Sequence, residues 1–98
     1  MIKLIFQSGP LGGHRYAVDH DVTLGRDASN AIVIPDAAVS LVHCRIGFEG
    51  RHAFVTDLGS TNGVRVNGLR TIQTELRDGD SLQVGKNRIR IEWIGPAP

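Results

Sequence analysis

The chain has 98 residues, of which 41% are apolar, and its eleven Lys and Arg residues against ten acidic ones give a net charge of +1. This size predicts one globular domain, and the apolar share excludes a disordered chain. The near-neutral charge argues against nucleic acid as the main partner, because nucleic-acid-binding domains usually carry a strong basic excess. No apolar run approaches the roughly 18 residues that a membrane span requires, so no membrane insertion is expected.

A single cysteine, Cys44, excludes a disulfide framework. The apolar segment at residues 1–6 is too short and too soon interrupted for a signal peptide. Both features favour a reducing compartment, and we expect a cytoplasmic protein.

Apolar and polar residues alternate with a period of two along most of the chain. The alternation is clearest at 88–93, where Ile89, Ile91 and Trp93 share one face. Other strand-like runs, in chain order, are 2–7, 15–18, 22–24, 31–34, 42–48, 53–58, 64–66, 72–76 and 81–84. About ten short strands with turns every 8–12 residues or so predict an all-β sandwich or barrel.

Smaller features complete the predicted architecture. Cys44 is expected in the core with Ile46 and Phe48, whereas the pattern at 53–58 does not decide which face is buried. Residues 36–39 predict one helical turn at most. The Gly-Pro-Ala-Pro ending is typical of a linker. We therefore predict a folded domain over residues 1–94 and a linker-like tail over residues 95–98.

Three turns carry unusual polar residues: Gly25-Arg26, Ser40-Leu41-Val42-His43 and Gly59-Ser60-Thr61-Asn62-Gly63. If these turns share one end of the sandwich, a guanidinium fork meets hydroxyl and amide donors, an arrangement that suits phosphate. The alternative for 59–63 is a plain turn. A hairpin needs only two central residues, however, so Ser60 and Thr61 exceed what closure requires.

Taken together, Gly25-Arg26, Ser40-x-x-His43 and Gly59–Gly63 followed by Val66-Asn67-Gly68 resemble the forkhead-associated (FHA) domain family. The resemblance extends over about residues 2–94 and includes the turn at 78–80. Each motif alone is short, but the order and spacing of all three are specific. The resemblance implies an FHA-like β-sandwich of about eleven mostly antiparallel strands with binding loops at one end.

That resemblance implies a function as well: recognition of phosphothreonine peptides in phosphorylation-dependent protein–protein interactions of signalling or assembly. The implied partner is a substrate of a Ser/Thr kinase, and neither a cofactor nor a metal is expected. By position in the motifs, the residues that would hold the phosphate are Arg26, Ser40 and Thr61. Asn62 would bond the peptide backbone, Leu41 and Ser60 would lie at the rim where specificity is determined, and the structural residues would be Gly25, His43 and Gly63.

The chain departs from the family pattern directly after the motif serine. The family often has a polar or basic residue there that assists phosphate binding, whereas this chain has Leu41 and Val42. Basic support around the phosphate is therefore thinner. Hence the second candidate is a phosphate-independent docking or assembly module on the same fold, which binds through sheet faces or these apolar residues.

An enzyme is not expected. Ser40, His43 and Asp57 could be imagined as a hydrolase triad, but nothing in the sequence signals the geometry that activates a serine. The remaining histidines, His14, His20 and His52, show no metal-ligand spacing.

Overall fold

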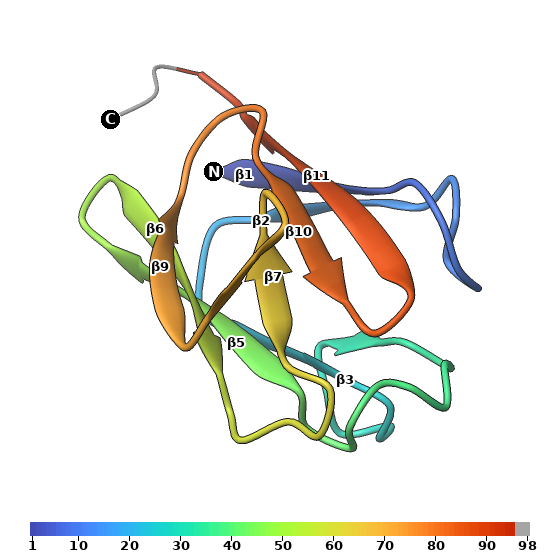
Figure 1. The fold of residues 1–98 in the computed structure, drawn as a ribbon. Helices are drawn as coiled ribbons and strands as arrows, with labels where there is room; N and C mark the ends of the chain where they lie inside the picture. Colours follow the sequence, from blue (N-terminus) through green and yellow to red (C-terminus); the bar gives the residue numbers. More distant parts are fainter. Residues whose placement is uncertain (96–98) are drawn as a thin grey trace.

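The computed structural model describes residues 1–95, and in it eleven strands form two stacked sheets (Figure 1). The predicted β-sandwich is thus confirmed. The strands are β1 (Ile2–Phe6), β2 (Arg15–Val18), β3 (Val22–Gly25), β4 (Ile32–Val33), β5 (Cys44–Glu49), β6 (His52–Asp57), β7 (Val64–Val66), β8 (Leu69–Thr71), β9 (Gln73–Leu76), β10 (Ser81–Val84) and β11 (Asn87–Trp93).

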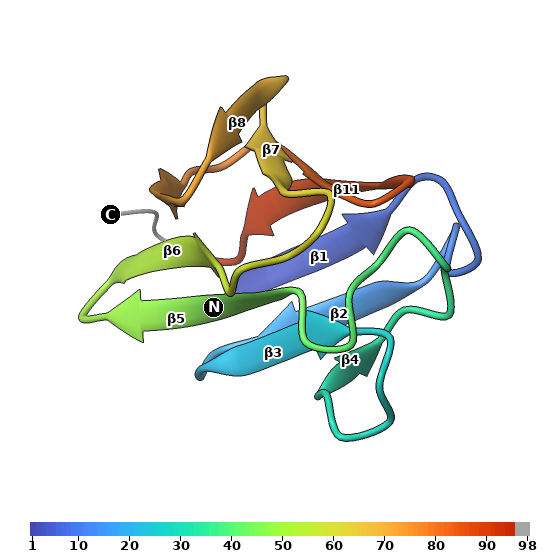
Figure 2. The ribbon, with the colours of Figure 1, turned by 60° about the horizontal axis from the view of Figure 1, so that its bottom comes forward.

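One sheet has six strands in the order β2-β1-β11-β10-β7-β8, and the other has five in the order β4-β3-β5-β6-β9. Figure 2 shows the two layers with the long connections gathered at one end. Strand pairs are antiparallel except β3 with β4. The strands that begin and end the fold pair with each other, and the Ile94 N–H donates to the Met1 carbonyl at 3.0 Å.

The core lies between the sheets and follows the period-two pattern. In β11, Ile89 and Ile91 are fully buried, while Trp93 is half-buried and its indole N–H donates to the Leu76 carbonyl. In β6 the buried side chains are Ala53 and Val55, which answers the question that the sequence left open. Burial of such apolar side chains contributes about 1.5–3 kcal/mol for each large one and is the main stabilising term.

One local feature differs from the prediction. The short edge strand β8 was not expected, because only three residues separate the Asn67-Gly68 turn from Ile72; both turn residues have positive φ (52° and 83°), as a tight hairpin requires. Residues 36–39, predicted to make one helical turn at most, form a single turn closed by the Val39 N–H and the Asp36 carbonyl, and no helix. Apart from Gly95, the predicted tail lies outside the described residues.

Candidate functional site

The three polar turns meet because β3, β5 and β6 are antiparallel neighbours. Leu24 lies opposite Cys44, and Cys44 lies opposite Asp57. One end of the five-stranded sheet therefore holds the end of β3, the start of β5 and the end of β6. The loops at this end of the sheet gather at the bottom of Figure 1. Strand pairing thus produces the convergence that the sequence could pose only as a condition.

Arg26 is tied to the neighbouring loop through its backbone and its side chain. Its N–H donates to the Ser40 carbonyl at 3.0 Å, and its Nε donates to the Val39 carbonyl at 3.1 Å. Within residues 1–95, no hydrogen bond engages the two terminal nitrogens of the guanidinium. The fork is therefore anchored at Nε and still presents donors for a planar or tetrahedral oxyanion.

The Ser40 hydroxyl keeps its proton available for a hydrogen bond. Its Oγ accepts a hydrogen bond from the Thr61 N–H at 3.0 Å, so the hydroxyl proton is not consumed by this contact. A hydroxyl has one proton and two lone pairs, and accepting from a backbone N–H leaves the proton for an incoming acceptor. This bond also joins the second and third turns at the point where Arg26 reaches the Ser40 carbonyl.

His43 is fully buried and bonds both turns through its ring. The Ser40 N–H donates to Nδ1 at 3.0 Å, and Nε2 lies 2.8 Å from the Gly63 carbonyl. Since Nδ1 accepts, Nε2 must carry the proton and donate to that carbonyl. Both ring nitrogens are thus bonded to backbone groups, and neither forms a hydrogen bond with the Ser40 hydroxyl.

The third turn is held by its own polar side chains. Asp57 accepts from the Ser60 N–H at 2.9 Å, and the Ser60 Oγ accepts from the Gly63 N–H at 2.9 Å. Ser60 therefore bonds within the turn, beyond the rim role expected for it. The Asn62 amide donates to the Ala38 carbonyl at 2.7 Å, which holds this exposed side chain against the second turn.

Two glycines allow close backbone approach. A Cβ on Gly25 would lie 2.3 Å from the Leu41 carbonyl oxygen, so no larger residue fits between the first two turns. Gly63 has φ +81°, and a Cβ there would lie 2.7 Å from Nε of Arg70. Gly25 is thus required by contact with a backbone atom, and Gly63 by its positive φ, since the exposed Arg70 side chain could move aside.

Asn30 is a structural residue of the site that the sequence analysis missed. It is 6% exposed, and its Nδ2 donates to the carbonyls of Asp27 and Leu41, each at 2.7 Å. It therefore ties the Arg26 loop to the Ser40 loop, while its buried Oδ1 has no partner among the described residues. The only signal was an asparagine just before an apolar run, which is too common to single out.

Exposed apolar side chains adjoin the polar turns. Leu41, Val42 and Leu58 are 54%, 42% and 42% exposed, and each adjoins one of the polar turns. Asp27, the acidic residue next to Arg26, does not pair with the guanidinium, because its carboxylate accepts hydrogen bonds from the Ser29 hydroxyl and N–H. The hydroxyl contact chiefly lowers the pKa of Asp27, which stays ionised without forming a close ion pair with Arg26.

Other site types find no support in the described part of the chain. Over residues 1–95, no group of three or more His, Cys, Asp or Glu side chains is placed to hold a metal ion. In the same range, no helix has the length and apolar character to cross a membrane.

Comparison with known proteins agrees with this geometry. The family model described as "FHA domain" matches residues 22–85. Glycogen accumulation regulator GarA of Mycolicibacterium smegmatis is 36% identical over 87 residues, which cover 88% of this chain and 55% of that regulator. An oxoglutarate dehydrogenase inhibitor of Corynebacterium efficiens is 34% identical over 96% of this chain and 66% of its own. The chain thus spans little more than half of the GarA relative.

Solved structures extend the likeness to three dimensions. An FHA domain analysed for phosphothreonine-dependent interactions superposes with a TM-score of 0.87 at 29% identity, covering 97% of this chain and 98% of that one. The FhaA FHA domain, solved in complex with an intracellular domain of another protein, gives 0.86 at 30% identity over 94% and 100%. From the family match and the relatives, this chain belongs to the forkhead-associated (FHA) domain family.

Proposed function

We propose that this FHA domain binds phosphothreonine-containing segments of other proteins through the loop end built by the three polar turns. As a member of its family it is a binding module and not an enzyme. The observation that carries the proposal is the Arg26 fork anchored on Val39, beside a Ser40 hydroxyl whose proton is left to donate. Thr61 supplies a further hydroxyl at the same end of the sheet, and Asn62 supplies an amide for the peptide backbone.

The proposed partner is a protein phosphorylated by a Ser/Thr kinase, met in the cytoplasm. The free, buried Cys44 suits a compartment where thiols stay reduced. Residues 1–94 are the proposed binding unit, because pairing of β1 with β11 closes the sandwich, and residues 95–98 are the proposed tail.

The test is calorimetric titration of a phosphothreonine peptide library, before and after phosphatase treatment. Arg26→Ala should abolish binding, and Arg26→Lys should weaken it strongly, because a point charge cannot replace two parallel N–H donors. Loss of the charged donor should cost about 2–5 kcal/mol. Arg51→Ala, in the exposed turn at the far end of β5 and β6, is the matched control and should bind as the parent does. Binding that survives dephosphorylation would contradict the proposal.

The exposed rim favours a second candidate, phosphate-independent docking of an apolar partner segment on Leu41, Val42 and Leu58. Leu41→Arg separates the two candidates, because it should change their binding affinities in opposite directions. A phosphothreonine-binding domain should gain up to about 1 kcal/mol of binding free energy for generic phosphothreonine peptides, since the added charge is exposed. An apolar docking module should lose its partner and gain nothing from phosphate.

A further inference from the structure

The outer face of the six-stranded sheet carries most of the positive charge of a nearly neutral chain. Strand register places one acidic residue on this face, Glu92, out of ten in the chain. Side chains that alternate away from the core and pair across the strands include six of the eleven basic residues: Lys3, Arg15, Arg65, Arg70, Arg88 and Arg90.

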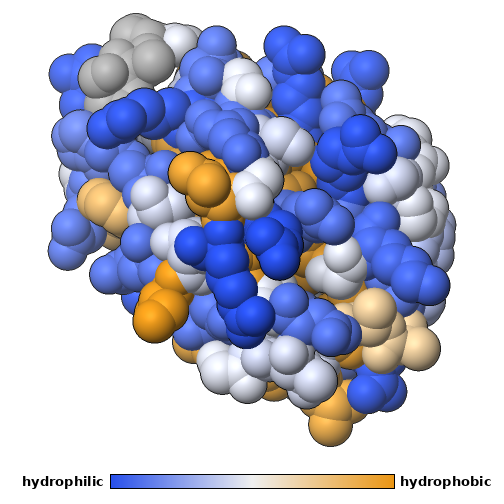
Figure 3. All heavy atoms as spheres, viewed as in Figure 1, coloured by the Kyte–Doolittle hydropathy of each residue, from blue (hydrophilic) through white to orange (hydrophobic). Residues whose placement is uncertain are grey.

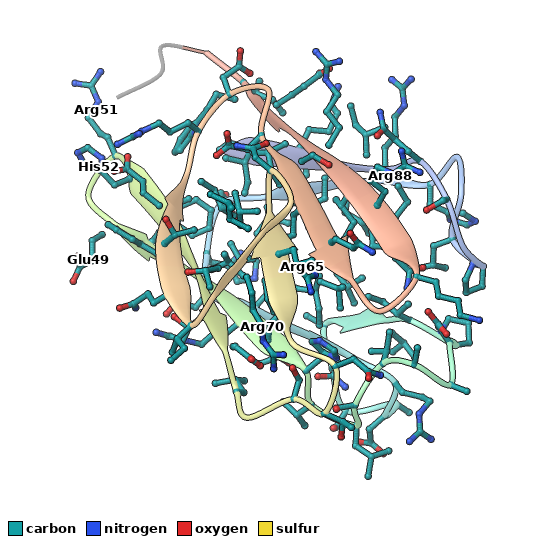
Figure 4. All side chains as sticks on the ribbon, in the orientation of Figure 1. Glu49, Arg51, His52, Arg65, Arg70 and Arg88 are labelled. Carbon is teal, nitrogen blue, oxygen red and sulfur yellow. The ribbon has the colours of Figure 1, made fainter. Side chains whose placement is uncertain are left out.

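Three of these arginines form a row across neighbouring strands. Arg70 of β8 lies opposite Arg65 of β7, Arg65 lies opposite Gln83 of β10, and Gln83 lies opposite Arg88 of β11. Figure 4 shows the three labelled arginines running from the middle of the view to β11. In the same view the surface over these strands is largely hydrophilic (Figure 3). With strands about 4.8 Å apart, the row spans about 14 Å.

This basic row (Arg70, Arg65, Arg88) forms no ion pair within the described residues, although Glu75 and Asp80 line the same groove as Arg70. On this face the ion pairs of residues 1–95 include only Arg90 with Glu92, at 3.5 Å. The two opposed side chains diverge along the hairpin, since Arg65 donates to the Gly68 carbonyl at 3.3 Å whereas the Arg70 guanidinium lies against Gly63. The row therefore presents separate positive charges, each available to an external anion.

The row begins at the phosphothreonine site. Arg70 lies against Gly63, the last residue of the third turn, where a Cβ would meet Nε, Cζ and a terminal nitrogen of Arg70 within 2.9 Å. Gly63 is also the residue whose carbonyl accepts from His43. A peptide held at Thr61 and Asn62 therefore has a path from the loop end onto the row.

We propose that the basic row binds an acidic tract, rich in Asp and Glu, in the same protein segment that presents the phosphothreonine. The inference rests on the proposed function and adds the class of partner sequence. An extended tract rises about 3.3–3.6 Å per residue, so four or five residues match the length of the row. Nucleic acid is the less suited anion, because the aromatic rings of this sheet, Phe6, Tyr16 and Trp93, pair on the core side and offer no stacking surface.

The test uses two acidic phosphothreonine peptides, one with eight Asp/Glu residues before the phosphothreonine and one with eight after it. Each has a neutral counterpart in which Ser and Gln replace the acidic residues. One of the two acidic peptides should bind about tenfold more tightly than its neutral counterpart at low salt, and the gain should shrink as salt is added. The triple variant R65Q/R70Q/R88Q should lose this gain and keep the affinity for the neutral peptide. The control variant R45Q/R51Q, whose arginines lie on β5 of the other sheet and in the β5–β6 turn, should retain the gain.

The outcomes separate this inference from the proposed function. Phosphate-dependent binding of the neutral peptides with no acidic gain, or an equal loss of gain in R65Q/R70Q/R88Q and in the control R45Q/R51Q, overturns the basic row alone. Binding of an unphosphorylated acidic tract that R65Q/R70Q/R88Q removes supports the row even if the phosphothreonine site fails. Binding of duplex DNA or phosphatidylserine vesicles through the row, without an acidic-peptide gain, overturns it in favour of those anions.

Discussion

At the residue scale, His43 connects the loops by hydrogen bonds from both ring nitrogens to backbone groups. His43→Phe would keep the apolar contacts but leave the Ser40 N–H and the Gly63 carbonyl without partners. Each buried unpaired group costs about 1–3 kcal/mol, so urea unfolding should show a loss of that order or more. Phosphopeptide affinity should fall as well, because both partners belong to the site. His20→Phe, at an exposed position, is the control, and an equally stable His43 variant would contradict this role.

Gly25 tests the close packing of the first two turns. In Gly25→Ala the new methyl group would overlap the Leu41 carbonyl, a backbone atom that cannot turn aside. Overpacking of this kind typically costs about 1–3 kcal/mol and should displace Arg26, weakening binding together with stability. Gly47→Ala is the matched control, since its nearest neighbour is an Arg45 side-chain atom at 3.4 Å. Equal stability of the two variants would show that the loops adjust without strain.

At the element scale, Asp36 attaches the Ser40 loop to the turn between β10 and β11 in the other sheet. Its carboxylate accepts from the Ala38 N–H at 3.0 Å, the Lys86 N–H at 3.1 Å and the Asn87 amide at 2.9 Å. The backbone bond from Ala38 is the chief cause that lowers the pKa of Asp36 below 3.8. The carboxylate thus stabilises the fold only while it is ionised.

The pH dependence of Asp36→Ala follows from that sign. A lowered folded-state pKa gives stability that is complete above pH 3.8 and is lost as the pH falls through the folded-state value. The difference in unfolding free energy between the parent and Asp36→Ala should therefore be constant near pH 7 and shrink below about pH 4. Asp19→Ala, which removes an exposed carboxylate beside His20, should cost little at any pH. A difference that grows in acid would contradict this account.

At the scale of the whole molecule, Cys44 reports opening of the sandwich. It is fully buried between the sheets, and burial raises its pKa from 9.0 to about 12. Only the thiolate attacks a disulfide reagent, so the folded protein should be nearly inert at pH 8. Labelling should occur through unfolding, and its rate should rise with urea in step with the unfolding equilibrium. Fast labelling of the folded chain would place a local opening at the start of β5.

The raised thiol pKa also gives a stability trend. The unfolded chain ionises Cys44 first, so the contribution of the buried thiol is complete below pH 9.0 and is lost as the pH rises towards 12. Comparison of the parent with Cys44→Ala isolates this contribution from that of other groups. The difference in unfolding free energy should decrease above pH 9.

The sequence alone determined the fold class and the family. Period-two alternation, as in β11, follows from the geometry of a strand with one buried face, and it identified most strands. The motifs identified the family because glycine and asparagine requirements are local: Gly63 and Asn67 have positive φ that few other residues tolerate. The roles of Arg26, Ser40, Thr61 and Asn62 stay predictions, now with a geometry that suits them.

Tertiary structure alone decided what depends on strand register. The meeting of the three turns arises because Leu24, Cys44 and Asp57 pair across β3, β5 and β6, and no local pattern encodes that pairing. For the same reason Asn30 and Asp36 escaped notice, since their partners lie across a loop or in the other sheet. The basic row is the largest such effect: Arg65, Arg70 and Arg88 are scattered in a chain of net charge +1, and only sheet order places them in one row.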